Sequence, residues 1–596
     1  MKKYILILLV FTTLIVSCSD FLDKAPDEDM TVEDVFSSTI WTRNFLAHIY
    51  SWIPTEANFA DDGGLWRSPF VGASDEMEIA YGGAFAHEIN SGAWNSTNIT
   101  RVPIWNETYQ ALRRLNLFLE NVDNVPTTAD QINTWKGEGY YLRAYFHFLS
   151  FRTVGPIILL DHTVNTGDDL LSYTRQSVEE SIDFMVEDLD RAISLLDDRV
   201  ADNEVGRVTR VAAMALKSRI LLYAASPLYN GNNDFANFTD STGMALFPQN
   251  YDSNKWKIAA DAALETILTS EAAGYGLYQS VSNDPVANYQ EIFINNWNRE
   301  VLFAKNLDRY EHHFRCADPI SLSGFSIFNP TQEMVDAYQM EDGSTPIIGY
   351  SDNGLTPIIN PESGYREDGY VENARAGRWP QGVRNMFVNR EPRFYASINF
   401  PGQVWKNHAI QVWFDGIDGR KNAGSDYCKT GYLMKKAMNE RNSWNPWQVE
   451  QNTWIISRLG EIYLNYAEAL NEFSGPSTEV YNYVNMIRNR SGLPNLEEGL
   501  SKEEMREKIW HERRIELAFE THRFFDVRRW KIAEETDDKP VHSLNIFAGS
   551  HLQDNAFYQR IVVEQRVFES PKHYFFPIEQ NEIDKNDQNL VQNPGW

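Results

Sequence analysis

The chain is poor in cysteine, in basic residues and in long hydrophobic runs. Its 596 residues include three cysteines, too few for a disulfide framework, and the sequence leaves open whether Cys316 and Cys428 pair. Lys and Arg number 54 against 83 Asp and Glu, a formal net charge of −29, which argues against nucleic acid because its binding needs a basic surface. Beyond residue 16, no stretch approaches the length of a membrane-spanning helix.

The N-terminus has the pattern of an exported protein. Lys2 and Lys3 precede an apolar run over 4–16, which is too short to span a bilayer and is typical of a signal peptide. The end of this run resembles a bacterial lipobox, in which Cys18 is acylated and becomes the new N-terminus; an ordinary signal peptide with a chance cysteine is the alternative. We therefore predict a lipoprotein signal peptide over 1–17 and a flexible, acidic tether over 18–30.

Apolar residues at helical spacing predict helices over 136–152, 177–196, 209–226 and 458–472. Ser177 and Glu180 form a capping-box pattern, Pro227 ends the third helix, and residues 157–160 are expected to be extended. Small residues such as Ala215 and Ala467 allow close helix approach. The fold class predicted is mainly α, with stacked helical hairpins of the tetratricopeptide type.

Between residues 274 and 453 the helical periodicity weakens, and Gly, Pro, Asn and Trp become frequent. This texture predicts a large, loop-rich irregular insertion, which is where binding surfaces are usually built. We therefore expect one domain over 31–596, composed of an N-terminal helical part (31–273), the insertion (274–453) and a C-terminal helical part (454–596).

Charged residues are densest over 509–530. His511 and Glu512 begin a zincin-like pattern, but Ile515 occupies the second ligand position, so no zinc site is expected there. The acidic residues recur every fourth position, and arginines lie between them. This spacing predicts a partly buried ion-pair network on one helix, made by Glu512, Glu516 and Glu520 with Arg513, Arg514 and Arg523.

No other motif indicates catalysis, a metal or a cofactor. Cys428 stands where a phosphate loop requires glycine before Lys429. The adjacent His312 and His313 point apart on regular backbone, so a structural metal there would need ligands from elsewhere. Residues 415–419 lack the EF-hand pattern and favour a turn over a calcium site. We expect no catalytic residue, no metal and no cofactor.

Several blocks of sequence, in a fixed order, resemble the SusD/RagB family of outer-membrane lipoproteins from Bacteroidetes-type bacteria. The blocks are CSDFLDKAP (18–26), LRAYFHFLSFRTVGPIILL (142–160), ALKSRILLYAASPLYN (215–230), EPRFYASI (391–398), RLGEIYLNYAEALNE (458–472), IRNRSGLP (487–494), IWHERRIELAFETHRFFDVRRW (509–530), KHYFFPIEQNEI and the terminal QNPGW. The resemblance implies a tetratricopeptide-like scaffold lipid-anchored to the outer membrane and facing the cell exterior. It also implies a SusC-like TonB-dependent transporter as partner.

A sugar packs its C–H face on an aromatic ring and needs polar partners for its hydroxyls, so a site requires exposed aromatics in polar loops. Residues 61–98 and 308–325 meet this criterion, and the family resemblance points to an early loop and to the loop before the turn at 329–332. The predicted ligand-binding residues are Trp94 and Tyr310 first, then Trp66 and Phe314, with Asp75 and Arg315 as polar partners.

The function expected is capture of an oligosaccharide or polysaccharide and its delivery to the transporter, without catalysis. Peptide capture is the alternative within the binding class, and it would favour a wider, less aromatic groove. A surface glycoside hydrolase and a helical scaffold that binds only protein are the rivals from other classes.

Overall fold

The computed structural model describes residues 30–56, 68–307, 311–586 and 589–596. The predicted signal peptide, Cys18, nearly all of the predicted tether, Trp66 and Tyr310 lie outside these residues. Over the part of the chain that is described, no helix combines the length and the apolar character needed to cross a membrane.

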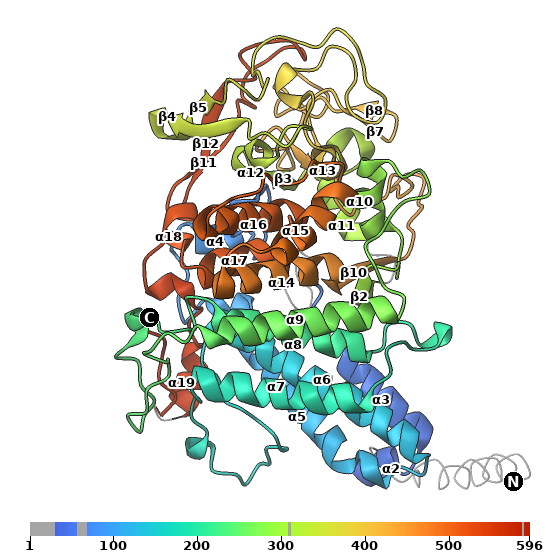
Figure 1. The fold of residues 1–596 in the computed structure, drawn as a ribbon, viewed down its shortest axis with the longest axis vertical. Helices are drawn as coiled ribbons and strands as arrows, with labels where there is room; N and C mark the ends of the chain where they lie inside the picture. The colour runs from blue at the N-terminus through green and yellow to red at the C-terminus, as the bar shows by residue number, and fades with distance from the viewer. Residues whose placement is uncertain (1–29, 57–67, 308–310, 587–588) are drawn as a thin grey trace, which may run out of the picture.

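Helices that pack on their neighbours along the chain build the lower half of the molecule (Figure 1). They are α2 (Val32–Phe36), α3 (Thr39–Ser51), α5 (Ile104–Asn121), α6 (Ala129–Val154), α7 (Val178–Leu195), α8 (Arg210–Ala225) and α9 (Asn254–Ala272). From α5 to α9 each helix packs on the next, and α9 packs on α14 (Leu459–Ser474) although nearly 200 residues separate them in sequence. This succession is the predicted stack of helical hairpins.

The sequence places these helices correctly because their ends carry clear signals. Ser177 and Glu180 form the predicted capping box of α7, each side chain accepting a backbone N–H of the other residue. The predicted helices over 136–152, 209–226 and 458–472 are α6, α8 and α14, and α6 begins seven residues earlier than predicted. Residues 157–160 are extended, as expected.

Small side chains let the central helices approach closely. A separate hydrophobic cluster joins α8, α9 and α14, and its alanines include Ala215, Ala263 and Ala469, all fully buried. Larger residues such as Tyr463 fill the spaces between them. Close helix packing at alanine positions therefore holds α14 against α8 and α9, and so joins the first half of the chain to its last third.

Shorter helices form the remainder of the molecule. Four lie in the region predicted to be loop-rich: α10 (Pro285–Ile294), α11 (Glu311–Ala317), α12 (Gln332–Ala337) and α13 (Pro392–Ser397). The others are α4 (Ala86–Asn90), α15 (Thr478–Arg490), α16 (Lys502–Glu516), α17 (His522–Arg529), α18 (Ala533–Thr536) and α19 (Gln580–Lys585).

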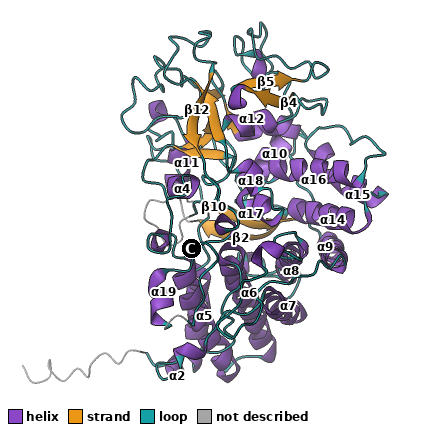
Figure 2. Ribbon diagram, turned by 90° about the vertical axis from the view of Figure 1, so that its left-hand side faces the viewer, coloured by secondary structure: helices purple, strands orange, loops and turns teal. Residues whose placement is uncertain are grey.

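The strands pair only two at a time (Figure 2); within the described ranges they make six antiparallel two-stranded sheets. The pairs are β1 (Met77–Ile79) with β3 (Phe328–Pro330), β2 (Val301–Leu307) with β10 (Asn452–Arg458), β4 (Ile347–Ser351) with β5 (Thr356–Ile359), β6 (Ile398–Asn399) with β9 (Leu433–Met434), β7 (Val404–Trp405) with β8 (His408–Ala409), and β11 (Pro540–Leu544) with β12 (Arg560–Gln565). Turns and loops connect most of them, so the insertion is irregular despite its four helices.

Candidate functional site

Two exposed tryptophans project from a short hairpin over residues 441–450, here called the tryptophan loop. Ser443 and Gln448 close it with two backbone hydrogen bonds, of 2.7 and 2.9 Å. At its base the Glu450 carboxylate accepts hydrogen bonds from Asn439 Nδ2 and Arg441 Nη2, both at 2.8 Å. These hydrogen bonds hold the loop in place before a ligand arrives, so binding does not have to order it.

Trp444 and Trp447 lie side by side at the tip of the tryptophan loop. Their side chains are 37% and 49% exposed, and their ring centroids are 5.2 Å apart with the planes at 76°. The guanidinium of Arg315, on α11, covers one face of Trp444 at 3.8 Å and the ring of Phe325 at 4.0 Å. Arg315 therefore lies between two rings, whereas Trp447 is the most exposed ring of the group.

A cavity of about 670 Å³ adjoins the tryptophan loop. It is lined by the segment after α11, the β7–β8 turn and the start of the tryptophan loop. The lining residues are polar except for Leu322 and together offer both hydrogen-bond donors and acceptors: Asp318, Ser321, Leu322, Ser323, Lys406, Asn407, Glu440, Arg441, Asn442, Ser443 and Asn445. A polar cavity beside exposed aromatic rings matches the chemistry of a sugar, with its apolar face and its ring of hydroxyls.

The cavity wall is held by buried polar contacts. Asp318 accepts hydrogen bonds from Trp405 Nε1 at 2.8 Å and from Lys406 Nζ at 2.6 Å, which anchors the β7–β8 turn to the segment after α11. Burial raises the pKa of Asp318, and the neighbouring Lys406 offsets only part of that rise. Asp418 receives the backbone N–H of Ser321 and lies 2.8 Å from the ring of His408, so the same wall is tied from a second side.

A second cavity, of about 320 Å³, lies between α5, the segment around residues 158–173 and α19. Trp105 and Tyr109 line it, with their ring centroids 4.8 Å apart, but Trp105 is buried. Ile158, Val164 and three leucines form the apolar part of the remaining wall, and polar side chains such as Asn106 and Gln110 form the rest. This cavity has fewer groups for hydroxyls than the cavity beside the tryptophan loop.

The structure buries two of the aromatic residues predicted to bind ligand. Trp94 is 2% exposed because the C-terminal segment folds over it, with Phe576 and Trp596 packed edge-on at 4.5 and 4.6 Å. Phe314 is also buried, with Lys406 Nζ 5.2 Å from its ring. The exposure expected for both residues is wrong, and neither presents a ring face to a sugar.

Of the two predicted polar partners, only Arg315 lies beside the candidate site. Asp75 is buried between Arg514 and Arg523, at 2.8 and 2.7 Å, so its carboxylate holds the early loop against the C-terminal helices. Trp66 and Tyr310 lie outside the described residues. The sequence reasoning passed over Trp444 and Trp447, although the polar, proline-containing string RNSWNPWQ (441–448) meets the same criterion of aromatics in a polar loop.

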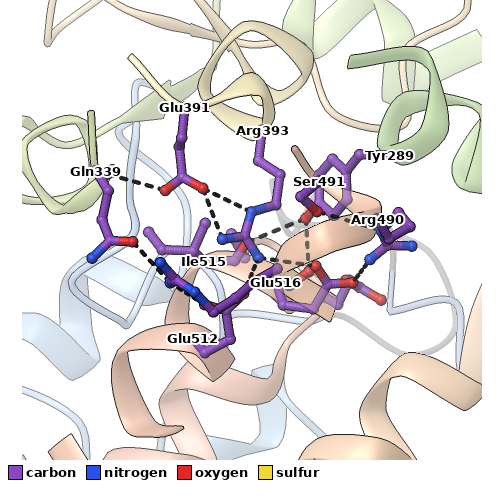
Figure 3. Close-up of polar contacts among 12 residues, drawn as sticks. Tyr289, Gln339, Glu391, Arg393, Arg490, Ser491, Glu512, Ile515 and Glu516 are labelled. Atoms are coloured by element: carbon purple, nitrogen blue, oxygen red, sulfur yellow. Dashed lines mark hydrogen bonds and ion pairs between the residues drawn. The ribbon is translucent and has the colours of Figure 1, made fainter. Parts of the chain in front are cut away.

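The charge-rich segment 509–530 forms a buried ion-pair network, as predicted (Figure 3). Its centre is Glu516, which pairs with Arg458 at 2.6 Å, with Arg393 at 3.2 Å and with Arg490. Burial acts to raise the pKa of Glu516, but the three guanidinium groups outweigh it and hold that pKa well below its usual range. A group so completely paired holds elements together and is not available to a substrate.

The predicted geometry of this network is wrong in two respects. The three glutamates do not share one helix, because α16 ends at Glu516 and the chain turns through left-handed conformations at Phe519 and Thr521 before α17 begins. The partners of Glu516 come from distant segments and not from neighbouring turns of its own helix. Most members of the network are buried, and Arg514, with its side chain 19% exposed, is partly buried as predicted.

One group of possible metal ligands occurs among the described residues: Glu78, His87 and Glu564 bring their ligand atoms within 4.8 Å of one another. Lys429 Nζ lies 2.9 Å from Glu78 and Arg566 Nε lies 2.8 Å from Glu564, so both carboxylates already have cationic partners. A bound metal ion would be repelled by both, and the group is better described as a buried ion-pair cluster.

The remaining motifs have structural roles. Residues 415–419 form the predicted turn, with Asp415 paired to Lys421 at 2.7 Å. His313 packs against Phe328 and Trp454, and the His312 side chain lies outside the description. Cys316 and Cys428 are both buried, and burial raises the pKa of the Cys428 thiol to about 12. The two cysteines form no disulfide with each other, which answers the pairing question that the sequence left open.

Comparison with known sequences and structures gives consistent matches. The family model described as "SusD family" matches residues 275–596, and one described as "Starch-binding associating with outer membrane" matches residues 20–222. SusD-like protein P2 of Formosa agariphila is 21% identical over 618 aligned residues, covering 100% of both chains. A solved SusD-like protein from Bacteroides fragilis is 26% identical with a TM-score of 0.75, over 96% of this chain and 100% of that one. A SusD-like carbohydrate-binding protein from the same species is 21% identical with a TM-score of 0.71, over 93% and 99%.

Proposed function

The chain belongs to the SusD family, and from that premise we propose that it captures oligosaccharides at the tryptophan loop and passes them to an outer-membrane transporter. The observation that carries this proposal is the pair of exposed tryptophans beside a polar cavity of about 670 Å³. The second family match, whose description refers to starch binding and the outer membrane, supports both the ligand class and the membrane.

Trp447 is the principal platform for a sugar ring in this proposal. Arg315 covers one face of Trp444, so the more exposed Trp447 has more of its ring available. Ser443 and Asn445, on either side of Trp444, line the cavity and offer donors and acceptors to sugar hydroxyls. A ligand would thus rest on the loop and extend its polar groups into the cavity.

Delivery needs attachment and a partner. We propose that acylation of Cys18 anchors the chain to the outer membrane with the helical scaffold facing the exterior, where two or more acyl chains give lasting attachment. A SusC-like TonB-dependent transporter is the proposed partner, on the strength of the family. Release into such a transporter suits modest affinity, since a few stacked rings must offset the ordering of a flexible glycan.

Native affinity gels containing a panel of polysaccharides test the binding function. We expect at least one glycan to retard the purified chain, and Trp447→Ala to weaken that retardation by about 10-fold, because a stacked ring contributes on the order of 1.5 kcal/mol. Trp41→Ala is the matched control, since Trp41 is 50% exposed on α3, outside the site, and its loss should change nothing.

Two results would contradict the proposal. One is an absence of retardation by every polysaccharide, with binding of a peptide mixture instead. The other is release of reducing ends from a retained polysaccharide by the purified chain, which would indicate a hydrolase. Equal retardation of wild type and Trp447→Ala would show that the glycan binds at a site other than the tryptophan loop.

A further inference from the structure

Arg315 has hydrogen-bond donors that no described residue uses. Its guanidinium makes no ion pair and no hydrogen bond within the described ranges, and its Nε is buried without a partner. An arginine offers five N–H donors in a planar fork and stays charged. A buried donor left unsatisfied costs about 1–3 kcal/mol, so this arrangement is poorly explained by stability alone.

The two aromatic rings fix how Arg315 meets a ligand. Phe325 and Trp444 lie 4.0 and 3.8 Å from the guanidinium carbon, and each attracts the cation through its π-face. Side chains stacked in this way leave the donors at the edge of the guanidinium plane. From that edge, arginine binds a carboxylate or a sulfate through two parallel hydrogen bonds.

Most acidic groups near the cavity already have partners. Asp318 is bonded to Lys406 and Trp405, and Glu450 is bonded to Arg441 and Asn439. Glu440, which also lines the cavity, acts electrostatically on the buried Lys435. Within the described part of the chain, Arg315 therefore stands out as a positive charge not committed to a carboxylate, and the net charge of −29 would otherwise repel polyanions.

We propose that the glycan captured at the tryptophan loop carries an anionic group, either a uronate carboxylate or a sulfate ester, and that Arg315 binds this group through two hydrogen bonds. The inference rests on the proposed function and deepens it by naming the class of glycan. The sugar bearing the anion lies next to the one stacked on Trp447, and the remaining hydroxyls face the cavity.

Calorimetry with matched pairs of polysaccharides tests this inference. Two pairs test binding of a carboxylate: polygalacturonate with its methyl ester, and alginate with carboxyl-reduced alginate. Two further pairs test binding of a sulfate: carrageenan with desulfated carrageenan, and dextran sulfate with dextran. Each pair is titrated into wild type, Arg315→Gln, Arg315→Lys and Trp447→Ala, at low and at high salt. Arg191→Gln is the control for loss of an arginine, because Arg191 is exposed on α7, outside the site, and is paired with Glu187.

We expect wild type to bind an anionic member more tightly than its neutral counterpart, and the difference to shrink at high salt. Arg315→Gln should weaken binding of the anionic member by about 10- to 100-fold and leave the neutral member unchanged. The affinity of Arg315→Lys for the anionic member should lie between those of wild type and Arg315→Gln, since lysine keeps the charge but lacks the paired planar donors of arginine. Arg191→Gln should bind as wild type does.

Equal affinity for both members of every pair that binds, or equal losses for both members in Arg315→Gln, would overturn the inference. In that case the proposed function still stands if Trp447→Ala weakens binding of the neutral glycan. Binding of no member by wild type contradicts the proposed function, and the inference falls with it. Thermal melting of each variant shows that the differences are not due to unfolding.

Discussion

At the scale of single residues, two adjacent buried carboxylates behave in opposite ways. Asp75 lies between two arginines, and although its burial acts to raise the pKa, their charges lower it well below its usual range. The Glu76 carboxylate accepts a hydrogen bond from the backbone N–H of Phe519 at 3.2 Å, and Arg523 and Lys436 stabilise its charge from farther away. Burial first, and then the negative charge of Asp75, raise the pKa of Glu76 to about 8.

This difference predicts how stability depends on pH. Because the pKa of Glu76 is about 8 in the folded chain and near 4.5 in the unfolded chain, the folded state holds a proton that the unfolded state releases between these values. The contribution of Glu76 is therefore fully present below about pH 4.5 and is lost as pH rises toward about 8. We expect Glu76→Gln, which stays neutral, to reduce this fall in the free energy of unfolding.

Urea unfolding at a series of pH values measures this effect. Glu507→Gln is the control for loss of a carboxylate, because Glu507 is exposed on α16. His87, whose pKa is also raised, contributes to the wild-type pH dependence in the same direction, so the comparison with wild type isolates Glu76. Parallel pH profiles for wild type and Glu76→Gln would show that Glu76 is ionised in the folded state.

The sequence predicts the chemistry of individual residues better than it predicts their exposure. Trp94 and Trp447 both lie in polar segments, with a glycine or an asparagine two residues before the tryptophan, and this composition does not predict which ring is buried. What buries Trp94 is the chain terminus, since Trp596 packs against its ring from about 500 residues away. Contacts between such distant segments depend on the whole fold, which is why Trp94 was chosen and Trp447 was missed.

At the scale of elements, the buried network around Glu516 joins segments that the sequence keeps far apart. Arg458 ends β10, Arg490 ends α15 and Arg393 lies in α13, so one carboxylate on α16 connects three other elements (Figure 3). Helix positions follow from local periodicity and capping, which the sequence displays. The identity of a buried charge partner does not follow from the local sequence, which is why the charge pairs were predicted within one helix.

Loss of the central carboxylate should therefore be costly. We expect Glu516→Gln to lower the free energy of unfolding by about 3–5 kcal/mol, since it leaves three buried guanidinium groups with one partner fewer. Chemical denaturation monitored by circular dichroism provides the measurement. Glu507→Gln, on the exposed side of the same helix, should stay within about 0.5 kcal/mol of wild type.

A small effect of Glu516→Gln would mean that the other carboxylates of the network, such as Glu300 and Glu512, compensate the arginines by themselves. Glu300 lies 2.9 Å from Arg458 and 3.0 Å from Arg490, so a double variant lacking both Glu300 and Glu516 measures that compensation directly. The coupling between the two substitutions then gives the contribution of the shared arginines.

At the scale of the whole molecule, a rigid helical stack supports an irregular region that carries the candidate site. The helices α5–α9 and α14 form the scaffold in the lower and middle parts of Figure 1, and α11 with the β7–β8 hairpin supports the cavity above them. Helical periodicity made the scaffold predictable. The loop-rich insertion has no such period, so its surface could not be predicted from the sequence.

The central claim is that a glycan binds across the tryptophan loop, and a crystal structure of the chain with a bound oligosaccharide tests it most directly. The account predicts a sugar ring stacked on Trp447, with hydroxyls directed into the cavity lined by Asn407 and Asn445. A glycan found instead in the cavity beside Trp105 and Tyr109, with the tryptophan loop empty, would contradict it.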